Sequence, residues 1–200
     1  VSYITRINLG AIISEIEANT QISRTLLSTA VTGSFITYGV GQIISGICGD
    51  LFSPKKLVQT GLIISVIMNL LMPLCASPYL MLLVWCINGF AQSMMWPPIV
   101  KMMSQLFDEE EYKKAAVIVS WGSSVGTIGV YLLVPAVLSA LSWKWVFYIC
   151  GSVAAVTVVL WQFYSYKPEI AETERCTAPS IRESLERAAE KLVNILKTLP

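Results

Sequence analysis

The chain has 200 residues, of which 54% are hydrophobic and only 14% are charged. A mean hydropathy of +0.63 is too high for a soluble globular domain of ordinary composition, so the composition indicates a membrane protein. The 14 basic residues nearly balance the 13 acidic ones, and this near-neutral charge excludes the basic surface that a nucleic-acid partner requires.

The sequence contains no histidine, and its five cysteines are scattered without a CxxC pair. These features argue against a metal site, a disulfide framework and a Ser-His catalytic arrangement, and we expect no cofactor. The N-terminus also lacks the basic region and cleavage site of a signal peptide. Residues 1–13 are apolar apart from Arg6 and too few to span a bilayer, so we interpret them as a truncated first helix.

Uncharged stretches predict five complete transmembrane helices, because a bilayer core about 30 Å thick needs about 20 apolar residues per helix. One stretch is twice that length and carries a turn signal at residues 76–78, Ala-Ser-Pro, which divides it into two helices. With the first helix, the predicted fold class is an all-α integral membrane bundle of six helices. The uncharged stretches are 26–49, 57–100, 115–143 and 145–166.

Basic residues in the loops predict which end of this bundle faces the cytoplasm. One side carries five lysines, against Arg24 and Lys144 on the other. Cytoplasmic loops of membrane proteins are the richer ones in lysine and arginine. We therefore expect a multi-pass protein of the cell membrane, with a cytoplasmic N-terminus and residues 167–200 cytoplasmic. The five lysines are Lys55, Lys56, Lys113, Lys114 and Lys167.

The composition changes after the last span and indicates two parts. Residues 1–166 are expected to form the transmembrane bundle, and residues 167–200 a charged cytoplasmic linker. Apolar residues recur in the linker at helical spacing, which predicts an amphipathic helix that packs on protein or lies on the membrane surface. These residues are Ile181, Leu185, Ala188, Leu192 and Ile195.

Arg6 stands out in the first helix, because an arginine inside a membrane helix is costly and usually faces a water-filled cavity or a counter-ion. The residues alone leave a second interpretation open, in which Arg6 is a flanking charge at the membrane interface. Tyr3 lies three residues before Arg6, and Tyr38 lies four before Gln42, so each pair shares a helix face. These side chains are candidates for the lining of a cavity.

Polar side chains also recur along one face of the fifth predicted span, and Asn88 and Gln92 form an i, i+4 pair on the fourth. We expect Asn88, Gln92, Ser120, Thr127 and Tyr131 to line the cavity. Helix packing is the alternative for the stripe, and Gly122 and Gly126 are consistent with it, because small residues four apart let membrane helices approach closely. The stripe on the fifth span consists of Ser120, Ser123, Ser124, Thr127 and Tyr131.

Several segments of the chain resemble the organophosphate:phosphate antiporters, a family of the major facilitator superfamily that includes the glycerol-3-phosphate transporters. The resemblance covers about residues 1–167. It rests on the run Tyr-Ile-Thr-Arg-Ile-Asn-Leu at 3–9, on Tyr38-Gly39, Gly46, Asp50 and Ser53-Pro54-Lys55, and on the run Gln-Ser-Met-Met-Trp-Pro-Pro at 92–98.

The resemblance implies the N-terminal six-helix half of a major facilitator fold, which pairs with a C-terminal half absent from the chain. Substrate then binds between the halves near the membrane midplane, and the halves rock to expose it alternately. It also implies that Arg6 grips an anionic group through charge-assisted hydrogen bonds, beside Tyr3, Tyr38, Gln42 and Ser123. The family's phosphate-ester carriers have lysine where Gln42 stands and histidine where Ser123 stands, so this chain departs from them twice.

Gly46, Asp50 and Lys55 loosely match the loop between the second and third helices of the superfamily, where contacts latch the cytoplasmic side. Leu51 replaces the basic residue usual after the aspartate, and an ordinary solvated turn is the alternative. Separately, Pro97 and Pro98 predict a kink near the cytoplasmic end of the fourth helix, because proline lacks an amide hydrogen and its ring clashes with the preceding turn.

These observations predict a secondary active transporter of a small organic anion, with phosphate or a phosphorylated metabolite as the first candidate. Two alternatives share the fold: an anion:cation symporter coupled to H⁺ or Na⁺, and a membrane sensor of sugar phosphates that binds without transport. An enzyme is not expected, since no motif assembles a nucleophile, a base and an oxyanion site. The expected partners are the anion, the lipid bilayer and the missing C-terminal half, with a homodimer as the alternative to the last.

Overall fold

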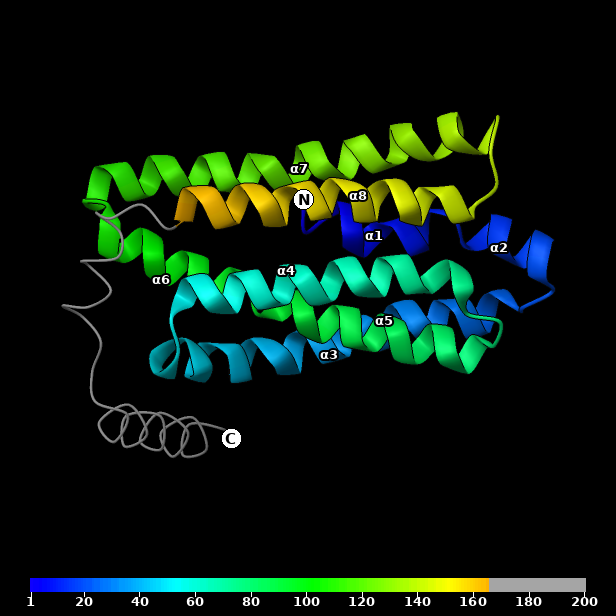
Figure 1. Ribbon diagram of the computed structural model, residues 1–200, viewed down its shortest axis with the longest axis horizontal. Helices are drawn as coiled ribbons and strands as arrows, with labels where there is room; N and C mark the ends of the chain where they lie inside the picture. The colour runs from blue at the N-terminus through cyan, green and yellow to red at the C-terminus, as the bar shows by residue number, and fades with distance from the viewer. Residues whose placement is uncertain (166–200) are drawn as a thin grey trace, which may run out of the picture.

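A computed structural model describes residues 1–165, so the predicted linker at 167–200 lies outside the described residues. Within 1–165 the elements are helices, arranged roughly parallel to one long axis (Figure 1). The prediction of an all-α bundle is thereby confirmed. The helices are α1 (Ile4–Ala11), α2 (Ile13–Thr20), α3 (Arg24–Leu51), α4 (Pro54–Leu71), the short 3₁₀ helix η1 (Met72–Leu74), α5 (Pro78–Ser93), α6 (Trp96–Leu106), α7 (Glu109–Leu138) and α8 (Lys144–Ser165).

Five of these segments are long and apolar enough to cross a membrane, as the uncharged stretches predict. The longest stretch is divided where the turn signal predicts, because α5 begins at Pro78, where a missing amide hydrogen costs nothing in the first helical turn. The candidate spans are Arg24–Gly49, Pro54–Leu74, Pro78–Leu106, Glu109–Leu138 and Lys144–Phe163.

The first helix is longer than its apolar part. It is interrupted at Ile12, whose backbone leaves the helical region (φ −120°, ψ 12°), and then continues as α2 to Thr20. A helix over residues 13–20 was not expected from the sequence. Its Ile16 is fully buried in the apolar core, whereas Glu15 and Glu17 on either side are only partly buried. Gln21, in the left-handed conformation, ends this helix.

The fourth span is broken rather than bent. Helix α5 ends at Ser93 and α6 begins at Trp96, so the interruption falls at residues 94–95. The sequence predicts a disturbance of this helix, and the interruption is that disturbance, but it lies closer to the middle of the span than expected. Pro97 and Pro98 enter the first turn of a new helix, where their missing amide hydrogens are tolerated, instead of interrupting an existing helix.

Figure 1 places alternate connections at opposite ends of the bundle. The connections at 52–53 and 107–108 and the end of α8 lie at one end, and those at 21–23, 75–77 and 139–143 lie at the other. The lysine-rich loops therefore share one end, as the predicted topology requires. Which side of the membrane this end faces stays a prediction.

The larger apolar cluster lies toward the end of the bundle opposite the lysine-rich loops (Figure 1). Trp85 of α5 meets Phe147 of α8 edge to face at 5.8 Å between ring centroids, and Trp143 meets Phe147 in the same way at 6.1 Å. Aromatic pairs prefer this geometry, because the positive ring edge faces the negative ring face. The cluster also contains Leu9 and Ile16, so it holds the first helix against α5 and α8.

Helices α3 and α5 pack most closely, and a glycine makes this possible. A Cβ atom at Gly89 would collide with the backbone oxygen of Ser34 and lie 2.7 Å from the Thr37 hydroxyl. Thr37 also donates a hydrogen bond across the interface to the Cys86 carbonyl oxygen at 2.8 Å. A small residue and a partly buried hydroxyl thus join these two helices, as expected for helices in lipid.

Candidate functional site

The guanidinium group of Arg6 lies between two aromatic rings and beside an amide. Its Cζ atom is 4.8 Å from the ring centroid of Tyr3 and 4.2 Å from that of Tyr38, within the range of cation–π attraction. Its Nε donates a hydrogen bond to Oε1 of Gln92 at 3.0 Å. Helices α1, α3 and α5 therefore meet at this one positive charge.

The partners of Arg6 fix its depth in the bundle. Tyr38 lies near the middle of the span Arg24–Gly49, and Gln92 lies near the middle of the span Pro78–Leu106. An arginine that contacts both lies near mid-depth, where a charge is costly unless it is compensated. This position does not fit a flanking charge at the membrane interface, the second interpretation of Arg6.

Within residues 1–165, no carboxylate forms an ion pair with Arg6. The described part of the chain also supplies no hydrogen bond to its two terminal Nη groups. An arginine has five N–H donors in a rigid fork, and here the protein occupies the one on Nε. The remaining four suit a group with two acceptor oxygens, such as a phosphate or a carboxylate.

A network of buried side-chain amides holds the backbone of α1 beside Arg6. The carbonyl oxygen of Thr5 accepts hydrogen bonds from Asn69 Nδ2 of α4 at 3.2 Å and from Asn88 Nδ2 of α5 at 3.0 Å. Asn69 also accepts a hydrogen bond from Asn8 at 2.8 Å, and all three asparagines are fully buried. Buried amides in such a network fix both the depth and the rotation of the helix that they hold.

Gln92 connects this network to the arginine. Its Oε1 accepts hydrogen bonds from Arg6 and from the Ser2 hydroxyl at 3.1 Å, and its Nε2 donates to Thr5 Oγ1 at 2.9 Å and Ser65 Oγ at 3.2 Å. Only 1% of Gln92 is exposed. Asn88 and Gln92, both predicted to line the cavity, have different contacts. Gln92 touches the arginine, and Asn88 supports the helix that carries it.

Sequence reasoning missed Thr5, Asn8, Ser65 and Asn69 as parts of the site. A signal was available, because each is a polar residue inside an apolar stretch with no charge nearby except Arg6. Ser65 and Asn69 are four residues apart, the same spacing as Asn88 and Gln92. Two such pairs on neighbouring spans indicate amides that face each other.

The predicted pairs around Tyr38 and Tyr3 are in contact with their partners. Gln42 Nε2 donates a hydrogen bond to the Tyr38 hydroxyl at 2.7 Å, which orients the ring that covers Arg6. Tyr3 is partly exposed, and its ring faces the guanidinium from within the same helix. Both tyrosines therefore belong to one site, with Gln42 behind one of them.

The polar stripe of α7 does not reach Arg6 within the described structure. The hydroxyls of Ser120, Ser123 and Thr127 donate to carbonyl oxygens of their own helix, and Tyr131 is 60% exposed. Gly126 packs against α1, where a Cβ atom would lie 3.5 Å from Cβ of Tyr3. The stripe therefore borders the helix contact that small residues predict, and its role as cavity lining, with that of Ser123 in substrate binding, stays a prediction.

The predicted gating residues lie at the lysine-rich end. Gly46 is exposed in α3, Asp50 lies in the last turn of α3 with its side chain outside the described structure, and Lys55 is buried at the start of α4. Lys101 of α6 donates a hydrogen bond to the Gly49 carbonyl oxygen at 2.7 Å and so caps the end of α3. Gating would require contacts with the other half of the protein, so the gating role stays a prediction.

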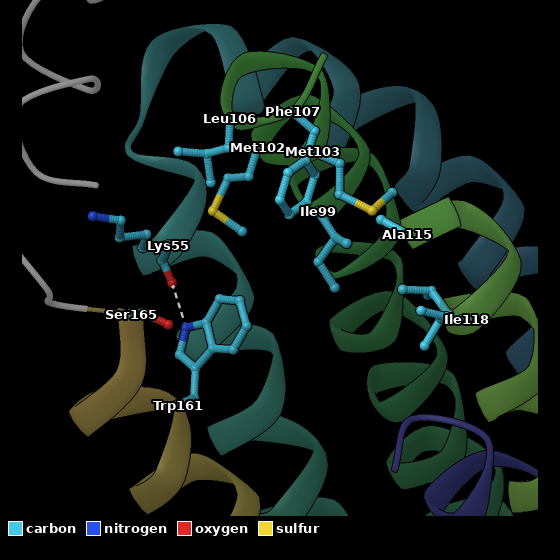
Figure 2. Close-up of a pocket in the computed structure, with 11 residues that line it drawn as sticks. Lys55, Ile99, Met102, Met103, Leu106, Phe107, Ala115, Ile118, Trp161 and Ser165 are labelled. Carbon is cyan, nitrogen blue, oxygen red and sulfur yellow. Dashed lines mark hydrogen bonds between the residues drawn. The ribbon is translucent and has the colours of Figure 1, made fainter. Parts of the chain in front are cut away.

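An apolar cavity of about 540 Å³ opens at the same end, between α4 and α8 on one side and α6 and α7 on the other (Figure 2). Trp161 closes one wall and donates a hydrogen bond from Nε1 to the Lys55 carbonyl oxygen at 3.2 Å. The cavity shares no residue with the set around Arg6, so it is a separate feature. It is lined by Lys55, Ile99, Met102, Met103, Leu106, Phe107, Ala115, Ile118, Val119, Trp161 and Ser165.

Cofactor and metal ligands were not expected from the sequence. Among residues 1–165, no group of three or more histidine, cysteine, aspartate or glutamate side chains is arranged to hold a metal ion. Burial raises the pKa of the Cys75 thiol, which lies just beyond the span Pro54–Leu74. The polar chemistry of the described chain is therefore concentrated at Arg6 and the amides beneath it.

An all-helical bundle with five candidate spans, broken first and fourth helices and an arginine at mid-depth defines part of a polytopic membrane protein with a polar interior site. The chain belongs to the Major Facilitator Superfamily, whose family model matches residues 1–195. This membership confirms the predicted superfamily and agrees with an N-terminal half of that fold. It also places the chain in a family of transporters and not of enzymes.

Three relatives show what the chain is similar to. Sodium-dependent phosphate transport protein 3 of Homo sapiens is 33% identical over 132 residues, which cover 64% of this chain and 30% of that protein. A probable hexose phosphate transport protein of Chlamydia muridarum (strain MoPn / Nigg) is 26% identical over 122 residues, 61% of this chain and 27% of that protein. The membrane sensor protein UhpC of Escherichia coli (strain K12) is 27% identical over 143 residues, 72% and 32% respectively.

The chain therefore matches less than a third of the length of each of these relatives. Their names mention phosphate, hexose phosphate and a sensor, and these agree with the likeness to the organophosphate:phosphate antiporters that the sequence predicts.

Proposed function

We propose that the full-length protein is a secondary active transporter of a small organic anion, with phosphate or a phosphorylated metabolite as the first candidate. The observation that carries this proposal is the Arg6 guanidinium, held at mid-depth between Tyr3 and Tyr38 without a carboxylate partner among the described residues. A positive charge in that position is compensated when an anion binds. Relatives named for phosphate and hexose phosphate transport support the same class of substrate.

The anion binds through the terminal Nη groups of Arg6 in this proposal. Those groups form the end of the guanidinium, whose Cζ atom lies over both tyrosine rings. A phosphate oxygen pair can take two parallel N–H bonds from that end, which favours tetrahedral or planar anions over a bare halide. The nearby rings displace water and so strengthen the pairing.

Transport requires a second side to the cavity, which a C-terminal six-helix half supplies in this proposal. Only 17% of an 18-residue apolar stretch is buried in each of the spans on α3 and α7, so these two helices leave large apolar surfaces uncovered. Substrate then binds between the halves, and rocking of one half against the other exposes it alternately. Gly46, Asp50 and Lys55 latch the cytoplasmic end of the bundle by contacts with the other half.

Two other functions draw support from particular relatives. A relative named as sodium-dependent favours an anion:cation symporter, and a relative named as a membrane sensor favours a protein that binds sugar phosphates without moving them. All three functions use an anion site at Arg6. They differ in the step after binding, which is exchange for a second anion, movement with a cation, or a signal without flux.

Uptake of labelled phosphate and glucose 6-phosphate by proteoliposomes that contain the full-length protein tests the proposal. We expect exchange against internal phosphate by the wild type and its loss in Arg6→Ala, because a neutral side chain cannot pair with the anion. Arg24→Ala is the matched control, since Arg24 is an exposed arginine at the opposite end of α3 from the lysines. Exchange at the wild-type rate by Arg6→Ala would exclude the anchor role.

The same vesicles separate the alternatives. Uptake that depends on a sodium or proton gradient, without internal phosphate, favours the symporter. Saturable binding of glucose 6-phosphate with no flux under any gradient favours the sensor. Absence of both binding and flux, for every anion offered, contradicts the proposed substrate class.

A further inference from the structure

Gln92 has no hydrogen-bonding capacity left over. A glutamine amide offers two acceptor sites on Oε1 and two donors on Nε2. Here Oε1 accepts from Arg6 and Ser2, and Nε2 donates to Thr5 and Ser65. Arginine can only donate, so the oxygen must face Arg6 and the nitrogen must face the two hydroxyls. The amide is therefore held in one orientation, and the guanidinium plane is oriented by it.

The residue that holds this arginine is neutral, and this has a consequence for the charge. A glutamate at position 92 would have the same length and could accept the same N–H at 3.0 Å. It would add a negative charge in contact with Arg6 and form the buried ion pair that the described chain lacks. Gln92 therefore orients the Arg6 guanidinium as a glutamate would, but without adding a negative charge.

We infer that Gln92 is a positioning residue that orients the Arg6 guanidinium while leaving its charge uncompensated, so that the transported anion must provide the compensating charge. The inference rests on the proposed function, because it concerns how the anion site at Arg6 selects its ligand. Because Gln92 is neutral, the site selects a ligand that carries a negative charge. A neutral sugar could fill the same space but would leave the guanidinium unpaired.

The other charged groups near Gln92 do not replace its role. Tyr3 of α1 and Tyr38 of α3 are neutral rings against the same guanidinium. On α4, Lys55 lies ten residues before Ser65, or about 15 Å along the helix. On the fourth span, Lys101 lies nine residues after Gln92, or about 14 Å away. Among the described side chains, Arg6 is thus the charge that Gln92 meets directly.

The test compares two substitutions in the purified full-length protein, Gln92→Glu and Gln92→Leu. Dissociation constants for inorganic phosphate and glucose 6-phosphate, with glucose as the uncharged control, are measured together with melting temperatures in detergent. We expect Gln92→Leu to bind the anions about tenfold more weakly, since the guanidinium loses its orientation. We expect Gln92→Glu to bind them about a hundredfold more weakly, since its carboxylate competes for Arg6.

The order of stability should be the reverse. Gln92→Glu keeps the bond to Arg6 and should melt at a higher temperature than Gln92→Leu, which leaves Arg6, Thr5 and Ser65 without that partner. A residue with a merely structural role would rank the two variants the same way in binding and in stability. Gln59→Glu is a further control, because Gln59 of α4 bonds Gln162 of α8 and does not contact Arg6; it should leave the affinity for the anions unchanged.

The outcomes separate this inference from the proposed function. Wild-type protein that binds the anions, with Gln92→Glu binding them more weakly than Gln92→Leu, supports the inference. Wild-type binding with Gln92→Glu at least as tight as Gln92→Leu overturns the inference and leaves the anion site standing. Wild-type protein that binds none of the anions overturns both.

Discussion

Helix α5 packs on its neighbours in two different ways, one on each side. Toward α3, Gly89 lets the two backbones touch, and Thr37 donates a hydrogen bond across the contact to the Cys86 carbonyl oxygen. Toward α1 and α4, Asn88 and Gln92 form directional hydrogen bonds that are fully buried. In lipid, apolar side chains gain little from leaving their surroundings, so close packing and hydrogen bonds must hold the helices together. The first side sets a distance, and the second also sets the position of Arg6.

The largest effect should come from breaking the close contact. Gly89→Ala places a Cβ atom against the Ser34 carbonyl oxygen, so α3 and α5 must separate, and we expect a loss of about 3 kcal/mol in unfolding free energy. Gly129→Ala in α7 is the matched control, because a Cβ atom there meets nothing within 4 Å. Denaturant unfolding in detergent measures both, and equal stability of the two variants would contradict the role of Gly89.

Breaking the amide side should cost less stability. Asn69→Leu removes the bonds to Asn8 and to the Thr5 carbonyl oxygen, and we expect a loss of about 2 kcal/mol. Asn19→Leu is the control, since Asn19 is exposed and bonds only within its own helix. The same unfolding assay applies.

Anion affinity then distinguishes the two sides of α5. It should fall in folded Asn69→Leu protein, because α1 carries Arg6 and loses one of its supports. A variant that keeps full affinity would show that the amides stabilise α1 without positioning its arginine.

A smaller effect is expected in the apolar core. The Nε1 group of Trp85 is buried without a hydrogen-bond partner among the described residues, whereas that of Trp161 donates to the Lys55 carbonyl oxygen. Trp85→Phe removes an unpaired donor together with some packing, so we expect a change of within about 1 kcal/mol. Trp161→Phe should lower the free energy of unfolding more than Trp85→Phe, because it removes the hydrogen bond to the Lys55 carbonyl oxygen. A larger loss in Trp85→Phe would indicate that the Trp85 Nε1 group has a hydrogen-bond partner.

The smallest effect concerns Cys75, in the apolar core at the start of the turn before α5. Burial raises the pKa of its thiol, so less thiolate exists at neutral pH and maleimide labelling should be slow. The labelling rate should rise only at a pH above that at which an ordinary thiol reacts. Ser77→Cys, two residues away and exposed, is the comparison in a background where the other cysteines are serine. Equal rates at all pH values would show that Cys75 is accessible.

The number, order and length of the spans could be predicted from the sequence, because charges interrupt hydrophobic stretches whose length the bilayer sets. The predicted break at residues 76–78 was correct for the same kind of local reason, a proline at the start of a helix. The helix α2 could not be predicted in this way. It has only 8 residues and mixes Ile13 and Ile16 with charged and polar residues, so no uncharged stretch marks it.

The site was predictable only in part. Arg6, Tyr3 and Tyr38 could be recognised because charge and aromatic residues at helical spacing are visible along one chain segment. Asn8 and Asn69 were missed although polar residues in apolar stretches are visible in the sequence; that these two residues, 61 apart, bond each other is not visible there. The opposite error affects α7, where a regular polar stripe bonds mostly to its own backbone within the described structure.

The Thr5 carbonyl oxygen, shared by two asparagines, has a mechanical consequence. It is tied to α4 and α5 at once, so turning or sliding α1 alone would break both bonds in the dry interior. We therefore expect α1, α4 and α5 to move together, with Arg6 fixed to them. A ligand held by Arg6 is then displaced by motion of these three helices as a unit against whatever lies opposite them.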